Sequence, residues 1–388
     1  MSALEASVHR RLLEAGVADH AVADVLARLV REEAPLLPAA EVADVVARVR
    51  ARVSGLGALD PLLADPAVTD VLVNGPGPVW VDRRGSLRRA DVVLDRPAID
   101  LLVERILAPT GRRVDPASPV VDARLPDGSR VHVVVPPLAV DGPCVAIRRF
   151  STRRVALDDV APPAVVELLR WAVRARANVV VSGATGSGKT TLLNALAAHV
   201  PDGERIVTIE DAAELDLPAE HVVRLETRPG SVEGVAEVSC RDLVRSALRL
   251  RPDRIVVGEV RGGEALELVA AMNTGHDGSL STVHANGAED ALRRLETLVL
   301  LAGVALPLPA VRDHLAAAVD LVVHIARTGG SARRVVEVAE VRPPDEAAEA
   351  GARRATRLLA DEGGVVRLPQ RPARDRSAAP PSPGWCTR

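Results

Sequence analysis

Lysine is almost absent from this chain of 388 residues, because Lys189 is the single lysine among 49 basic residues and the others are arginine. Aromatic residues are also scarce: there is no tyrosine, and Phe150 is the only phenylalanine. The sequence therefore offers few rings on which nucleic acid bases could stack. Its formal net charge of −3 gives no general attraction to nucleic acid or acidic lipid. We expect no direct binding of nucleic acid.

Cysteine and long hydrophobic runs are scarce as well. The cysteines Cys144, Cys240 and Cys386 are odd in number and far apart, so no disulfide framework or metal cluster is evident, which fits a reducing cytoplasm. The first residues lack a basic flank before an apolar core, so we expect no signal peptide. The most apolar stretch, residues 298–311, is too short and too rich in proline to span a bilayer. We expect a cytoplasmic protein that reaches the membrane only through partners.

The hydrophobic residues, 47% of the chain, can fill several cores, and the length suggests two or three domains. Residues 1–54 repeat apolar side chains at helical spacing, and charges of both signs on the other faces favour a small helical bundle over membrane association. Residues 55–150 combine short strand patterns, turns and at least one helix, which is typical of a compact α+β domain. Residues 151–157 are expected to form a linker.

From residue 158 to about residue 344, strand patterns alternate with helix patterns. This order predicts an α/β domain in which a parallel sheet is covered on both faces and ligands bind at the carboxyl ends of the strands. The last segment, residues 345–388, is rich in alanine, arginine, proline and serine. We expect this tail to be mostly disordered.

The one lysine stands in a phosphate-binding motif, Gly183-Ala184-Thr185-Gly186-Ser187-Gly188-Lys189-Thr190-Thr191, directly after an apolar strand pattern. Glycines let the backbone approach the phosphates, and a compact ammonium fits the tight ring of N–H groups better than a guanidinium does. Lys189 would bridge the β- and γ-phosphates, and Thr190 would offer its hydroxyl to Mg²⁺. The motif predicts binding of ATP and Mg²⁺.

Hydrolysis needs an acid near the γ-phosphate, and two predicted strands end in carboxylates. Ile255-Val256-Val257 leads through Gly258 to Glu259, which we expect to be the general base or the group that positions water. An aspartate usually ends this strand, and here Gly258 takes its place. A second strand ends in Glu210 and Asp211, which repel each other unless a cation lies close. This pair, with Glu210 ahead of Asp211, is expected to order metal or water.

Histidines and arginines supply further candidates. His276 and His284, two of the nine histidines, frame one glycine-rich turn and strand, which favours a nucleotide-sensing role although neither has the spacing of a zinc site. Arginines crowd residues 224–261, and in a ring-shaped ATPase some of them, such as Arg224 and Arg228, would reach a neighbour's nucleotide as arginine fingers. The sequence does not choose among them.

Together these segments resemble the secretion ATPases of the type II/type IV superfamily. The most similar branch is the CpaF-like one, which drives tight-adherence (Flp) pilus assembly and whose actinobacterial members are also labelled conjugal-transfer-associated ATPases. The resemblance covers roughly residues 55–342. It is carried by residues 183–191 (Walker A), 206–215 (Asp box), 251–262 (atypical Walker B) and 274–286 (His box), with upstream support from residues 121–130 and 146–150.

The resemblance implies a hexameric ring in which a PAS-like α+β domain is joined flexibly to a RecA-like P-loop ATPase domain. Nucleotide would bind between the two domains, and the first would contribute Arg130, Arg148 or Arg149. Hydrolysis would rotate the domains and act on inner-membrane platform proteins.

The expected function is therefore a Mg-dependent ATPase that powers pilus assembly or protein secretion. The alternatives are a conjugative type IV secretion ATPase, a nucleic-acid translocase on the same core, and a nucleotide switch that does not hydrolyse ATP. The cargo and the direction of work, assembly or retraction, stay open.

Overall fold

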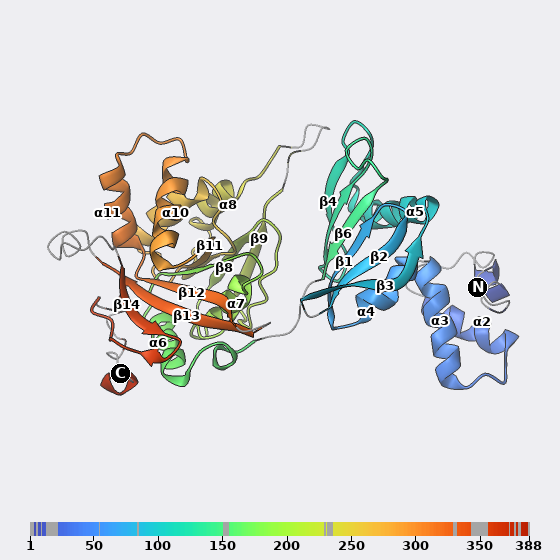
Figure 1. Cartoon of the computed structure of the whole chain (residues 1–388), viewed down its shortest axis with the longest axis horizontal. Coiled ribbons are helices and arrows are strands. Elements are labelled where there is room, and N and C mark those ends of the chain that lie inside the picture. The colour runs from blue at the N-terminus through green and yellow to red at the C-terminus, as the bar shows by residue number, and fades with distance from the viewer. Residues whose placement is uncertain are drawn as a thin grey trace. The chain divides into compact units, whose positions relative to one another are not determined.

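A computed structural model of the chain divides into two compact units, Met1–Ser151 and Thr152–Arg388 (Figure 1). The structure describes residues 4, 7–8, 10–12, 22–53, 55–83, 85–149, 155–228, 230, 236–328, 332–342, 356–371, 373–375, 378 and 382–386. Most of the expected linker, residues 151–154, lies outside these ranges.

The first unit opens with the helices expected for residues 1–54, α2 (Val22–Glu33) and α3 (Ala39–Val53). Leu26 and Val30 of α2 are fully buried and share one core with Val45 and Val49 of α3. Because these residues recur at helical spacing, each helix presents one apolar face to the other.

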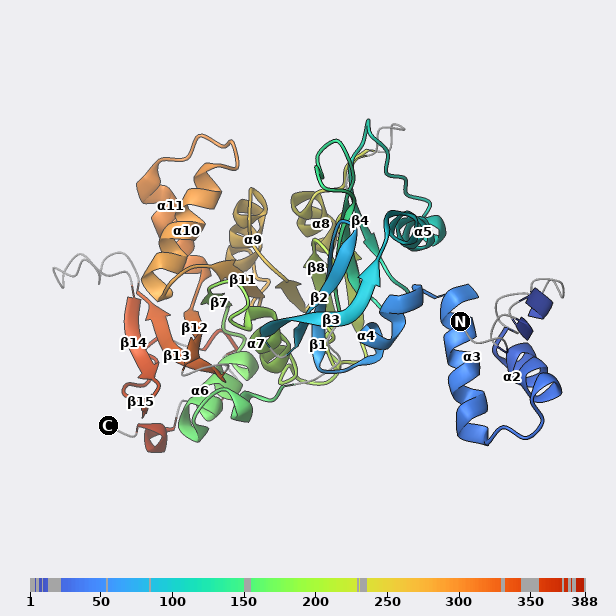
Figure 2. The ribbon, with the colours of Figure 1, turned by 45° about the vertical axis from the view of Figure 1, so that its right-hand side comes forward.

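An antiparallel sheet of six strands, in the order β3-β2-β1-β6-β5-β4, forms the rest of the first unit. The strands are β1 (Val68–Asn74), β2 (Gly77–Arg83), β3 (Ser86–Leu94), β4 (Val120–Arg124), β5 (Arg130–Val134) and β6 (Cys144–Arg148), and the short helices are η2 (Gly57–Leu59), α4 (Asp60–Ala64) and η3 (Ala108–Thr110). Helix α5 (Arg96–Leu107) lies against one face of the sheet (Figure 2). It begins where the Asp95 side chain accepts a hydrogen bond from the Ala98 N–H. This is the α+β domain that the sequence predicts.

The second unit is built on a sheet of nine strands in the order β15-β14-β13-β12-β7-β11-β10-β8-β9. Neighbouring strands from β12 to β9 run parallel, whereas β12, β13, β14 and β15 pair antiparallel, so the sheet is mixed and not wholly parallel as predicted. The strands are β7 (Val179–Gly183), β8 (Ile206–Glu210), β9 (Val222–Glu226), β10 (Arg254–Val257), β11 (Leu280–His284), β12 (Leu321–Thr328), β13 (Ala332–Val341), β14 (Thr356–Asp361) and β15 (Gly364–Val365).

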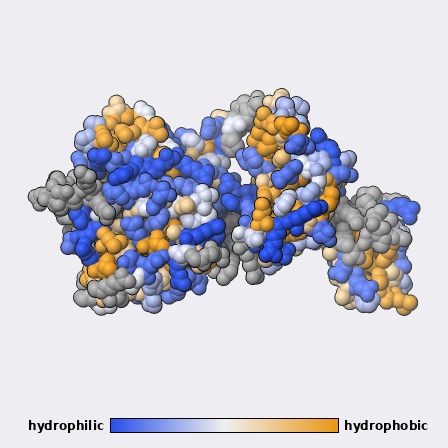
Figure 3. Space-filling view, in the orientation of Figure 1, coloured by the Kyte–Doolittle hydropathy of each residue, from blue (hydrophilic) through white to orange (hydrophobic). Residues whose placement is uncertain are grey.

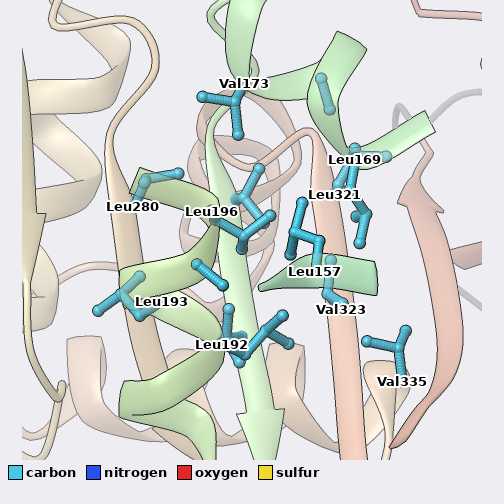
Figure 4. Packing of buried hydrophobic residues seen from close by; sticks show 14 of the residues in the cluster. Leu157, Leu169, Val173, Leu192, Leu193, Leu196, Leu280, Leu321, Val323 and Val335 are labelled. Carbon is cyan, nitrogen blue, oxygen red and sulfur yellow. The ribbon is translucent and has the colours of Figure 1, made fainter. Parts of the chain in front are cut away.

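Helices cover both faces of this sheet, as the alternating pattern predicts. Leu192, Leu193 and Leu196 of one helix pack beside the central strands (Figure 4). Val179 and Val181 of β7 belong to this core and Val180 faces the other one, which is the reason that three successive residues of the strand are apolar. One face carries α6 (Pro163–Arg174), α7 (Lys189–Ala197) and η4 (Leu157–Asp159), and the other carries α8 (Cys240–Ala247), α9 (Glu264–Asn273), α10 (Ala288–Leu300) and α11 (Leu308–Ala318).

The tail differs from the expectation of disorder. Within residues 345–388, strands β14 and β15 extend the sheet, and Leu359 and Val365 are fully buried in the same core as α7. The tail ends in the short helix η5 (Pro383–Trp385), where the ring of Trp385 meets that of Trp171 edge-on at 6.4 Å between centroids. Residues 343–355 lie outside the described ranges.

Hydrophobic side chains gather over α10 and α11 on the surface of the second unit (Figure 3). Leu301 is 72% exposed in the connection between these helices. None of the motif residues predicted from the sequence belongs to this surface. Among the described residues, no helix combines the length and the apolar composition that a membrane span requires.

Candidate functional site

The phosphate-binding loop, residues 183–191, joins β7 to α7 in the middle of the sheet. Gly183 ends β7 and pairs with His284, the last residue of β11. Gly186 and Gly188 have φ angles of 69° and 99°, which residues with side chains rarely adopt. Because Gly188 directly precedes α7, the loop turns into the N-terminus of a helix. The backbone therefore has the form of a phosphate cradle.

Lys189 is held inside this loop. Its side chain is only 7% exposed, and its Nζ donates to the carbonyl oxygens of Gly183 and Ala184 at 3.1 Å each. The same Nζ lies 3.2 Å from Nδ1 and 3.3 Å from Nε2 of His284. Burial lowers the pKa of Lys189, and the nearby carboxylate of Glu259 opposes that shift. A buried ammonium beside a helix N-terminus favours an anion in the loop.

Glu259 and Lys189 are linked through His284. Glu259 follows β10, and its Oε1 lies 2.8 Å from Nε2 of His284. Its Oε2 accepts a hydrogen bond of 2.5 Å from Arg261. Burial lowers the pKa of His284, with Glu259 acting in the opposite direction. The structure thus brings three of the predicted site residues, Lys189, His284 and Glu259, together at the carboxyl edge of the sheet.

Glu210 ends β8 at the same edge. It is only 4% exposed, and its Oε1 accepts hydrogen bonds from the backbone N–H groups of Glu214 and Leu215 at 2.8 and 2.9 Å. Its Oε2 is buried and has no hydrogen-bond partner within the described ranges. Burial raises the pKa of Glu210 to about 7 in spite of the two backbone donors. An oxygen left unpaired at this depth suits a metal ion or an ordered water.

The donor set around the loop fits Mg²⁺ only together with a nucleotide. Thr190 is half-buried in the first turn of α7, and Asp211 lies 3.5 Å from Arg261. No group of three or more metal-ligating side chains occurs in the part of the chain that the structure describes. Mg²⁺ commonly keeps several waters and takes one or two carboxylates together with substrate phosphates. These residues match that manner of binding.

His276, for which the sequence predicts a nucleotide-sensing role as it does for His284, does not lie at the loop. Its Nδ1 lies 3.3 Å from the carbonyl oxygen of Ala271, near the end of α9. It precedes β11, whose last residue is His284, so the two histidines flank opposite ends of one strand. A five-residue strand is about 15 Å long, which separates His276 from the edge where Lys189 lies.

The three candidate arginines of the first unit have partners within that unit. Arg148 forms an ion pair of 3.1 Å with Asp70, and it is the register partner of Arg130 between β5 and β6. Arg149 donates to the backbone carbonyl oxygens of Asp65 and Val68. Arg149 therefore stabilises its own sheet, whereas Arg148 is exposed and its ion pair lies at the surface.

The two candidates of the second unit are exposed and bonded to nearby backbone. Arg224 donates to the carbonyl oxygen of Ala213 at 3.3 Å, and its charge opposes the rise in the pKa of Glu210. Arg228 donates to the carbonyl oxygen of Ala236 at 3.2 Å. Arg224 is thus electrostatically coupled to the site in its own chain.

Two arginines near the loop escaped the sequence-based prediction. Arg327, near the end of β12, donates from Nε to the carbonyl oxygen of Gly186 at 3.2 Å. Arg333, near the start of β13, lies so close to Gly188 that a Cβ there would be 2.9 Å from its Cδ. No motif marks either residue, since their position depends on the antiparallel hairpin next to β7.

Known proteins are similar along most of the chain. A family model described as "Type II/IV secretion system protein" matches residues 53–363. The chain is 44% identical over 314 residues to a candidate conjugal transfer protein of Mycobacterium tuberculosis, covering 77% of this chain and 89% of that protein. It is 38% identical over 289 residues to the conjugal transfer protein TrbB of Rhizobium radiobacter, covering 72% and 85%.

A solved structure is similar in fold. The pilus retraction motor PilT, crystallised with bound ADP, aligns with a TM-score of 0.54 at 22% identity, covering 73% of this chain and 81% of PilT. The α/β fold class predicted from the sequence, a RecA-like sheet preceded by a smaller α+β domain, is thereby confirmed.

Proposed function

Because the chain belongs to the type II/IV secretion system protein family and is an ATPase of that family, we propose that it powers a secretion machine by hydrolysing ATP. The observation that supports this most directly is the line of contacts from Lys189 through His284 to Glu259. It joins a phosphate-binding cation to an acid at the place where the γ-phosphate of ATP would lie.

Each residue of the site has a distinct role in this proposal. Lys189 and the backbone N–H groups of residues 183–191 bind the β- and γ-phosphates. Glu259 orients the attacking water and takes its proton, and His284, in contact with both groups, senses whether the γ-phosphate is present. Thr190 and Glu210 would hold Mg²⁺, directly or through water, and the ion would neutralise charge on the phosphates.

The relatives support a proposal for the type of machine. Both relatives named above carry conjugal transfer in their names, which favours a conjugative type IV secretion ATPase over the Flp pilus assembly of the CpaF-like branch. Because the chain has so few aromatic residues on which bases could stack, it would act on protein components of the machine and would not bind the DNA itself. Pilus assembly is the second candidate, because the fold is also that of a pilus motor.

The working form in this proposal is a ring of six copies at the inner face of the cell membrane. In this proposal residues 55–150 form one domain, and residues 158–344 together with β14 and β15 form the other, with a linker within residues 151–157. Residues 1–54 are a separate helical region. Arginines would reach a neighbour's nucleotide, and Arg130 and Arg148 are better candidates than Arg149, which donates to its own backbone. Inner-membrane platform proteins of the machine would receive the motion.

Two variants test the ATPase assignment. Lys189→Ala should lose nucleotide binding, whereas Glu259→Gln should bind ATP and lose turnover by a factor on the order of 100 or more. Binding is measured by titration with a fluorescent ATP analogue and turnover by phosphate release. Substantial turnover by purified Glu259→Gln would sink the catalytic role of Glu259.

A mating assay tests the process. A donor strain whose gene for this chain carries Glu259→Gln should lose transfer of a conjugative element and keep its surface pili. Loss of pili with normal DNA transfer would reverse the ranking in favour of pilus assembly.

A further inference from the structure

The hairpin formed by β12 and β13 carries two arginines to the phosphate-binding loop. Arg327 and Arg333 are register partners across the two strands, so their side chains lie on the same face of the sheet. This is the face of α7, because Ile325 and Val335 next to them belong to the core that α7 fills. Both arginines also approach the loop glycines: Arg327 binds Gly186, and Arg333 lies over Gly188.

The two guanidinium groups carry charges that no acidic partner in the described ranges neutralises. Among the described residues, no carboxylate forms an ion pair with Arg327 or Arg333. Burial lowers the pKa of Arg333, and the positive charge of Arg327 lowers it further. The two like charges, which lie at the loop just before the N-terminus of α7, repel one another. An anion shared among them would remove that cost.

The order of the strands indicates which part of a bound nucleotide would lie near the hairpin. Strand β12 neighbours β7 on one side, whereas β11, β10 and β8 follow on the other side. Glu259 and Glu210 belong to that second side, and the γ-phosphate must lie next to them for hydrolysis. The opposite end of the polyphosphate, the α-phosphate, would therefore lie toward β12.

We propose that Arg327 and Arg333 bind the α-phosphate of the nucleotide, the part that ATP and ADP share. This rests on the proposed ATPase function and adds a subsite to it. Because the contact does not involve the γ-phosphate, it would strengthen the binding of substrate and product alike. The pair would thus slow the release of ADP and would not distinguish ATP from ADP.

Arg333→Ala in the Glu259→Gln background tests this, since that background allows ATP to be titrated without turnover. We expect the Kd values for MgATP and MgADP to rise by the same factor, roughly tenfold, as fits the loss of a charged hydrogen bond. Arg334→Ala is the matched control, because it removes one positive charge from the next residue of β13 on the opposite face. We expect this control to change neither Kd.

Three results would overturn the inference. These are an unchanged Kd in Arg333→Ala, a Kd that rises for MgATP alone, and an equal rise in the Arg334→Ala control. Arg333→Lys guards against a folding defect: with the same melting temperature as its parent, it should recover part of the affinity because it keeps the charge. If the Glu259→Gln parent binds neither nucleotide, the ATPase proposal itself fails. If the parent binds both nucleotides and one of these three results is found, only the proposed subsite fails.

Discussion

The side chain of Glu210 lies so close to Gly258 that position 258 has no room for a side chain: a Cβ on Gly258 would lie 2.8 Å from Cγ of Glu210. Gly258 is buried and follows β10, which pairs in parallel register with the strand that Glu210 ends. Real Cβ atoms are essentially never found so near another heavy atom. The glycine that replaces the usual aspartate of this strand therefore leaves the space that Glu210 occupies.

Gly258→Ala should lower the free energy of unfolding by about 1–3 kcal/mol, because the added methyl group has to displace Glu210 from a packed site. Urea denaturation of the variant and the parent measures this. The same substitution in a Glu210→Ala background should cost much less, since alanine has no Cγ. Equal costs in the two backgrounds would show that the two residues do not compete for space.

Glu210 should make stability depend on pH. Its pKa is raised from 4.5 to about 7, so the folded state holds this proton more tightly than the unfolded chain does. Its contribution to the free energy of unfolding is therefore largest below pH 4.5 and decreases as the pH rises toward 7. The decrease should be on the order of 3 kcal/mol. Urea denaturation at pH 5 and pH 8 measures it against Glu210→Gln, which should lack this component.

The same proton should affect magnesium. Mg²⁺ binds an ionised carboxylate, so the affinity for MgADP should rise as the pH increases through about 7. Calorimetric titrations between pH 6 and pH 8 measure this. Glu210→Gln is the control and should show a flatter profile. An identical profile in both proteins would remove Glu210 from the metal site.

The carboxylates of the site could be predicted because a short apolar strand followed by an acid is a local pattern. Parallel strands end at one edge of a sheet, and this places Glu210 and Glu259 near the phosphate-binding loop without further information. Lys189 could be predicted for the same reason, since its spacing from the glycines forms a local motif.

Features that depend on distant segments could not be predicted. Arg327 reaches Gly186 across 141 residues, through a hairpin whose direction no periodicity indicates. The sequence does place His276 and His284 at the two ends of one strand, but it does not show that Lys189 lies at the His284 end. Composition also concealed β14 and β15, because short strands contribute little to the average of a segment rich in arginine and alanine.

The two histidines should therefore differ in function. His284→Ala should reduce ATP turnover roughly tenfold or more, because it removes the imidazole that contacts both Lys189 and Glu259. His276→Ala should leave turnover near that of the parent and change mainly stability, since His276 contacts the end of α9. Phosphate release and thermal melting measure both effects. A similar loss of turnover in both variants would contradict this division.

The tail should contribute to the stability of the second unit. Leu359 is fully buried in the core shared with α7, whereas its neighbour Leu358 is 41% exposed on the opposite face of β14. Leu359→Ala should therefore cost about 2–5 kcal/mol through a cavity, and Leu358→Ala should cost less than about 1 kcal/mol.

Removal of the chain after residue 342 extends the same test. The shortened protein would lose β14 and β15 and expose the edge of β13, whose unpaired N–H and C=O groups are a template for aggregation. Urea denaturation and light scattering measure both effects against the full-length chain. If the shortened protein is as stable and as soluble as the full chain, and if both leucine variants behave alike, these strands are not part of the domain. We expect the opposite, because Leu359 and Val365 are fully buried and their removal would expose the core that they share with α7.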